Sequence, residues 1–101
     1  MTNPVIEIVN FKLAENVTPE AFLAAASAST NFVKAQPGFK ARRLSMGEDG
    51  RWLEHIEWES MSAAMAASEA MMKEASLGAF MQAIDMDSIE MRHHILQISE
   101  G

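Results

Sequence analysis

The chain has 101 residues, with 8 lysines and arginines against 14 aspartates and glutamates, and so a net charge of −6. This balance argues against nucleic acid and anionic membranes as partners, because both require clustered basic residues. The absence of cysteine excludes disulfides, thiolate metal sites and cysteine nucleophiles. We expect one domain over residues 1–101, and a cytoplasmic location because no signal peptide and no membrane-spanning apolar run is visible.

Residues 5–13 are rich in β-branched and aromatic residues and predict a strand. Alternate positions share a face, and both faces are largely apolar, which is typical of a central strand covered on both sides. Helices can cover only one of these faces. A second subunit is the simplest cover for the other.

A helix is predicted to begin after Thr18, which is a good N-cap and is followed by Pro19 at the first helical position. Val17 and Phe22 stand at the positions of a hydrophobic staple. Apolar residues continue at helical spacing until the Pro-Gly pair at 37–38, which is expected to end the helix.

Residues 39–46 and 51–59 predict two strands joined by a Gly-Glu-Asp-Gly turn, and therefore a hairpin. In the second of these strands Trp52, Glu54 and Trp58 share one face. Its alternate positions fall on the opposite face of the sheet.

Ser60 has the properties of an N-cap for a second helix over residues 61 to about 74, which residues 76–78 interrupt before a short further helical piece. Residues 89–98 predict the last strand. The order βαββαβ predicts a ferredoxin-like α+β fold, a four-stranded antiparallel sheet with two helices on one face. The bare face is expected to pair with a second copy, giving a homodimer and a dimeric α+β barrel.

Several segments resemble those of a known family. They are the first strand, Gln36-Pro37-Gly38-Phe39, Gly50-Arg51-Trp52, and Trp58-Glu59-Ser60 before an alanine-rich helix. Together they resemble the antibiotic biosynthesis monooxygenase (ABM) superfamily over nearly the whole chain. The resemblance implies a small-molecule cavity between sheet and helices within each subunit. Because its motifs are structural, it is more specific for the fold than for an activity.

Relatives in that superfamily include cofactor-free quinone-forming oxygenases and haem-degrading enzymes. The haem-degrading branch uses a strand tryptophan, a first-strand asparagine and an axial histidine on the second helix. Trp58 matches the tryptophan, and Asn10 lies near the asparagine, with a one-residue register difference that would turn it to the other face. The second helix has no histidine. We therefore expect poor haem binding and no cofactor.

Charged residues interrupt otherwise apolar strands at Glu7, at Arg42 or Arg43, at Glu54 and at His93. The resemblance implies that Arg42 is the arginine that joins Glu7, Glu54 and His93. Charges in such strands are costly unless paired, so we expect these side chains to form one cluster, and the resemblance implies that they converge in or beside the cavity. One interpretation is a structural ion-pair network. The other is an acid/base site, with His93 or Glu54 as the base.

Trp58, Trp52 and Met65 are candidate ligand contacts, although tryptophans are equally suited to anchor a core. The nine methionines of the chain either fill irregular gaps in the core or form an adaptable wall for an apolar ligand. His93 and His94 are neighbours on a strand and point to opposite faces, so no metal site is expected. The sequence does not decide whether His93 or His94 points toward the cavity.

Two functions follow from the resemblance. The first is a cofactor-free monooxygenase that acts on a small aromatic or polyketide-like compound, in which a base deprotonates a phenolic substrate and the resulting anion reduces oxygen. The second is a non-catalytic small-ligand-binding or stress-related protein with the same barrel. The fold alone does not decide between them, and the sequence does not name the ligand.

Overall fold

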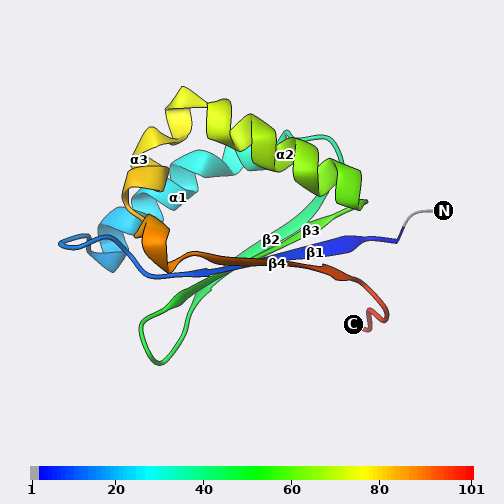
Figure 1. Cartoon of the computed structure of the whole chain (residues 1–101), viewed down its shortest axis with the longest axis horizontal. Coiled ribbons are helices and arrows are strands. Elements are labelled where there is room, and N and C mark those ends of the chain that lie inside the picture. Colours follow the sequence, from blue (N-terminus) through cyan, green and yellow to red (C-terminus); the bar gives the residue numbers. More distant parts are fainter. Residues whose placement is uncertain (1–2) are drawn as a thin grey trace.

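The computed structural model describes residues 3–101 as a four-stranded antiparallel sheet with its helices on one side (Figure 1). The elements are β1 (Val5–Phe11), α1 (Pro19–Lys34), β2 (Phe39–Met46), β3 (Trp52–Trp58), α2 (Met61–Lys73), η1 (Ala75–Leu77), α3 (Gly78–Gln82), η2 (Met86–Ser88) and β4 (Glu90–Ile95). The strand order β2-β3-β1-β4 is that of a ferredoxin-like α+β fold, and confirms the predicted fold class. The predicted break in the second helix is also present, at η1.

The first and last strands of the chain are shorter than the sequence predicts. β1 ends at Phe11 rather than at Leu13, which makes only an isolated bridge to Ile84. β4 covers Glu90–Ile95 rather than 89–98, because β1 is its neighbour in the sheet and offers no partner beyond Val5, which pairs with Ile95. The apolar pattern after residue 95 therefore continues past the end of the ladder.

α1 begins as predicted. The Thr18 hydroxyl accepts a hydrogen bond from the backbone N–H of Ala21 at 3.1 Å, and Pro19 takes the first helical position. Phe22 is fully buried under this first turn, and Val17 packs against the same cluster. Phe22 lies 4.8 Å from the ring of Trp52, so α1 is anchored on β3 by an edge-to-face aromatic pair.

A second part of the core lies under α2. It contains Val5, Ile56 and Trp58 from the sheet and Ala64 and Ala67 from the helix, all almost fully buried. The alanine face has little side-chain volume, so the helix axis can approach the sheet closely over Trp58.

The backbone conformation at position 38 and its close contact with α2 explain why the motif after α1 contains a glycine. The φ of Gly38 is +84°, and a Cβ at this position would lie 2.6 Å from the Cβ of Ala63 in α2. Its carbonyl accepts a hydrogen bond from the backbone N–H of Glu59 at 2.8 Å. The end of α1 and the exit of β3, which contain two of the motifs that carry the sequence resemblance, are thus joined directly.

The two faces of the sheet have different surroundings (Figure 1). Glu7, Glu54 and His93 lie on the inner face, which the helices cover. Ile8 and His55 pair with each other on the outer face, which no element of residues 3–101 covers. No helix within the described part of the chain has the length and apolar character needed to cross a membrane.

Candidate functional site

A cavity of about 240 Å³ lies between the inner face of the sheet and the helical segment that runs from α2 to η2. It is lined by Glu7, Val9, Phe11, Glu54, Ile56, Ser68, Met71, Met72, Phe80, Met81, Ile84, Met86, Ile89 and Met91. The lining is overwhelmingly apolar. Its polar side chains are the carboxylates of Glu7 and Glu54 and the hydroxyl of Ser68.

Methionines form much of the wall. Met72, Met86 and Met91 are 82%, 55% and 48% exposed, so they stand where the cavity opens to solvent. Met71 and Met81 are partly buried and lie further in. Because methionine is unbranched and flexible, this wall can adjust to apolar ligands of different shapes.

Glu54 on β3 is paired with Arg42 on β2. Nε of Arg42 donates to both carboxylate oxygens, at 3.1 and 3.0 Å, and Nη2 donates to Oε1. Nη1 donates to Ser29 Oγ at 3.0 Å, and the guanidinium lies 5.7 Å from the centre of the Phe80 ring. Only 11% of the Arg42 side chain and 7% of the Glu54 side chain are exposed. Both oxygens of Glu54 are therefore occupied by a buried, charge-assisted pair.

A β-bulge puts Arg42 on the inner face. Phe39 pairs with Trp58 and also faces inward, and the β2–β3 register then shifts, so that Ala41 pairs with Glu57. The extra residue, Lys40, reverses the alternation, and Arg42 rather than its neighbour comes to lie beside Glu54.

Glu7 on β1 is equally buried but lacks a guanidinium partner. Its Oε1 accepts a hydrogen bond from Trp58 Nε1 at 3.1 Å, and His93 Nε2 lies 3.9 Å from the same oxygen. Burial raises the pKa of Glu7 above its ordinary value of 4.5, and the nearby charge of Glu54 adds to this increase. His93 and the Trp58 N–H favour the carboxylate and act in the opposite direction, without cancelling the effect of burial.

His93 stands opposite Glu7 in the β1–β4 ladder, whereas His94 pairs with Ile6 and faces outward. The Nε2 atom of His93 is buried and makes no hydrogen bond within residues 3–101, since 3.9 Å is an ion-pair distance but too long for a hydrogen bond. His93 is thus the member of the pair on the cavity side, beside Glu7. In the same range, no group of three or more histidines and carboxylates is arranged to hold a metal ion.

Three predicted ligand contacts do not line the cavity. Trp58 is fully buried and reaches the site only through its N–H to Glu7, and Trp52 is part of the aromatic core under α1. Met65 is 54% exposed, because the face of α2 that turns toward the sheet carries Ala64 and Ala67. Direct ligand contact by Trp52 and Met65 is therefore at odds with the geometry.

Several residues of the site were not expected. Ser68 and Met91 line the cavity, and Ser29 supports Arg42. Met91 could have been found, because it lies two residues before His93 on the same strand face. Asn10 faces away from the cavity, where its Oδ1 accepts a hydrogen bond from Arg51 Nε.

The fold and this cavity define a ferredoxin-like α+β protein with a largely apolar cavity between its sheet and its helices. No protein-family model matches the chain, and no curated protein matches it in sequence. Solved structures do match, and many of them are named as antibiotic biosynthesis monooxygenases.

One such structure, from Bordetella bronchiseptica, superposes with a TM-score of 0.81 at 11% identity, over 96% of this chain and 100% of that one. SnoaB, a cofactor-independent oxygenase from Streptomyces nogalater, gives 0.65 at 15% identity, over 99% and 97%. The ActVA-Orf6 monooxygenase of Streptomyces coelicolor, in complex with Nanaomycin D, gives 0.69 at 16%, over 97% and 91%. At these identities the likeness is one of fold, and it confirms the ferredoxin-like α+β fold predicted from the sequence.

Proposed function

We propose that the protein is an ABM-type monooxygenase that binds a small aromatic or polyketide-like compound in the methionine-lined cavity and uses Glu7 as its proton acceptor. The observation that carries this proposal is a buried carboxylate, 6% exposed, that borders an apolar cavity and has no guanidinium partner. The similarity in fold to a cofactor-independent oxygenase supports an oxygenase that needs no bound group.

Glu7 suits the role of base better than the two residues favoured by the sequence alone. Both oxygens of Glu54 are occupied by Arg42. His93 is not part of the cavity lining, so it acts through Glu7 as a positioning residue. Burial raises the pKa of Glu7, and a base works best when its pKa approaches the working pH.

The side chains that line the cavity determine which class of ligand it can bind. Ionised carboxylates can only accept hydrogen bonds, so a ligand must offer a donor, such as a phenol or enol hydroxyl, to Glu7. The rest of the surface is apolar and favours fused rings over charged groups. A carboxylate or phosphate ligand would meet two acidic side chains and be repelled.

The reaction that fits is conversion of an activated ring CH₂ to a carbonyl. Glu7 removes the hydroxyl proton of the enol tautomer, in which the ring CH₂ has already lost one C–H proton. The substrate anion transfers electrons to O₂, and a C–O bond forms at this ring carbon to give a hydroperoxide. Loss of the second C–H proton breaks the O–O bond, so one oxygen atom stays in the carbonyl and the other leaves as water. The CH₂ group loses four electrons, and O₂ gains four.

Oxygen uptake with a panel of anthrones tests this proposal. We expect Glu7→Gln to reduce the rate at least about 100-fold, the usual contribution of a general base, while the exposed control Glu48→Gln retains it. The wild-type rate should increase with pH as Glu7 loses its proton. Binding of these compounds without oxygen uptake would exclude the monooxygenase.

A non-catalytic ligand-binding role is the alternative, and the adaptable methionine wall favours it. Such a wall suits a protein that binds several apolar compounds without a fixed orientation. In that case Glu7→Gln would leave the affinity for anthrones within about two-fold and no substrate would be consumed.

We also propose that two copies pair through the outer sheet face as a homodimer. Ile8 and Leu53 lie there beside Arg43, Glu57 and Arg92, which carry charges of both signs. A two-fold related copy can bury the apolar residues and bring unlike charges together. Light scattering should give about twice the mass of one chain, and Leu53→Asp should give the monomer. A monomeric wild type at tens of micromolar would contradict this.

A further inference from the structure

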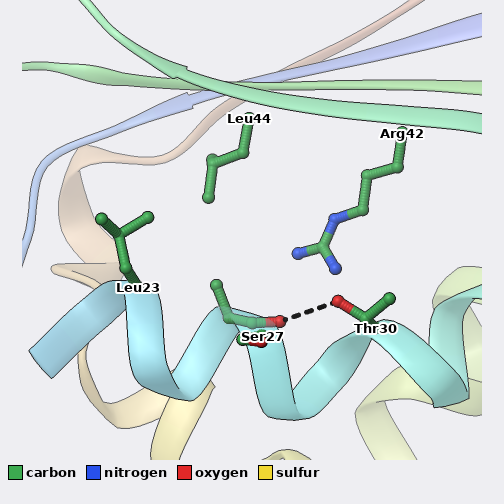
Figure 2. Close-up of a pocket in the computed structure, with 6 residues that line it drawn as sticks. Leu23, Ser27, Thr30, Arg42 and Leu44 are labelled. Atoms are coloured by element: carbon green, nitrogen blue, oxygen red, sulfur yellow. Dashed lines mark hydrogen bonds between the residues drawn. The ribbon is translucent and has the colours of Figure 1, made fainter. Parts of the chain in front are cut away.

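A second hollow lies on the opposite side of the Arg42–Glu54 pair. It is an open groove of about 280 Å³ between α1 and β2, lined by Leu23, Ala26, Ser27, Thr30, Arg42 and Leu44 (Figure 2). Figure 2 shows the Arg42 guanidinium reaching from β2 toward α1, with Leu23 and Leu44 forming the other end of the groove. Glu54 lines the cavity and Arg42 lines the groove, so one ion pair separates the two.

Arg42 has hydrogen-bonding capacity left for this groove. A guanidinium has five N–H groups. Nε and one N–H of Nη2 are directed to Glu54, and one N–H of Nη1 is directed to Ser29. One N–H on each terminal nitrogen is therefore without an acceptor within residues 3–101, although the side chain is only 11% exposed.

The groove and the cavity have opposite polar character. The groove contains no carboxylate, and its polar groups are the Arg42 donors and the hydroxyls of Ser27 and Thr30. Thr30 Oγ1 is directed to the Ala26 carbonyl at 3.5 Å, which is a long contact (Figure 2). A ligand for this groove must therefore supply a hydrogen-bond acceptor, with an apolar body against Leu23 and Leu44.

We propose that the groove is a second small-molecule site, selective for uncharged carbonyl compounds such as aryl ketones or amides. A neutral acceptor fits because the charge of Arg42 is already balanced by Glu54. An anion would add a second negative charge beside a buried carboxylate, which is unfavourable. The site does not depend on the proposed monooxygenase activity, because none of its contacts involves Glu7.

Backbone and arginine N–H chemical shifts in an NMR titration with acetophenone test the site. We expect saturable changes at residues 23–30 and at Arg42 Nε. Ethylbenzene, which lacks the carbonyl, should bind about five-fold more weakly or worse, the equivalent of one hydrogen bond of about 1 kcal/mol. Benzoate should also bind more weakly than acetophenone.

A variant separates the groove from the cavity without removing the buried arginine. Leu23 is 48% exposed, so Leu23→Glu should be tolerated and should place a carboxylate where the apolar body of the ligand would pack. We expect it to reduce acetophenone binding by at least about five-fold. Ala24→Glu, an exposed position next to it, is the control and should bind as the wild type does. Shifts confined to the cavity residues, equal binding of ethylbenzene, tighter binding of benzoate, or no effect of Leu23→Glu would each overturn the proposal.

Discussion

Glu7 and Glu54 lie on neighbouring strands, border the same cavity and are 6% and 5% exposed, yet their partners differ. Glu54 has a guanidinium that contacts both of its oxygens. Glu7 has an indole N–H and a histidine at 3.9 Å. Burial is therefore the same for both carboxylates, and the chemistry available to each depends on its partner.

The strand order produces this difference. β3 lies between β2 and β1, and β2 supplies an arginine to Glu54. β1 lies between β3 and β4, and these supply Trp58 and His93 to Glu7. One carboxylate is fixed in an ion pair that occupies both of its oxygens, and the other has no guanidinium partner.

The strongest way to test this comparison is to remove the cation from Glu54. Arg42→Met leaves a buried carboxylate without its partner, and we expect the free energy of unfolding to decrease by about 3–5 kcal/mol. Urea unfolding at pH 7 and constant protein concentration measures this. Adding Glu54→Met to Arg42→Met should recover much of the loss, because no charge is then left unpaired.

Lys40→Met is the matched control for that experiment. Lys40 is also on β2, but its side chain is 47% exposed and lies 4.0 Å from Glu57. We expect an effect below about 1 kcal/mol. An equal effect of both substitutions, or a double variant no more stable than Arg42→Met, would mean that pairing does not distinguish Glu54.

A smaller effect is expected when Glu7 loses its neutral donor. Trp58→Phe retains most of the ring and removes the N–H to Oε1, which should cost about 1–3 kcal/mol for a buried acceptor left unpaired, in addition to the lost volume. The N–H favours the carboxylate, so the pKa of Glu7 should rise further in this variant. Carboxyl carbon NMR against pH measures that shift.

Trp52→Phe is the control for the indole contact, because it makes the same change in the aromatic core away from Glu7. It should destabilise the protein through lost packing and leave the pKa of Glu7 unchanged. A shift of the same size in both variants would show that the N–H of Trp58 has no specific role.

The sequence was sufficient for the fold because its signals are local and agree with one another. The Thr18-Pro19 cap, the Pro-Gly end of α1 and the alternating strands each predict one element, and each element is present. The end of β4 was not predictable, because it depends on where its neighbour in the sheet begins, at Val5.

The site was only partly predictable. Strand alternation correctly groups Glu54 with Trp52 and Trp58, and only the resemblance implied that Glu7 lies on the same face of the sheet, where it is found. Strand alternation does not place Arg42, because the bulge at Lys40 reverses the alternation and has no clear signature in the sequence. Ligand contact by Met65 is not supported, because composition could not show which face of an alanine-rich and methionine-rich helix is buried. The roles of Glu7, Arg42, Glu54 and His93 remain predictions.

The smallest expected effect concerns the pH dependence of stability. The pKa of Glu7 is raised in the folded protein above its ordinary value of 4.5, so the folded state binds more protons than the unfolded state between these two pKa values. Stability contributed by this group is therefore complete below about pH 4.5 and is lost as the pH rises through the folded pKa. Glu7→Gln retains an acceptor for Trp58 and cannot ionise, so it should lack this loss.

Thermal unfolding of the wild type and Glu7→Gln at pH values from 4 to 8 therefore tests the direction in which the difference between their melting temperatures changes with pH. We expect the melting temperatures of the two proteins to be closest near pH 4. The melting temperature of the variant should then rise relative to that of the wild type as the pH increases, until Glu7 is fully ionised. Glu54→Gln should behave in the opposite way at pH 7 and melt below the wild type, because it removes the partner of Arg42. A constant difference between Glu7→Gln and the wild type at every pH would mean that Glu7 titrates alike in the folded and unfolded chains. That result would contradict the proposed role of Glu7 as the base.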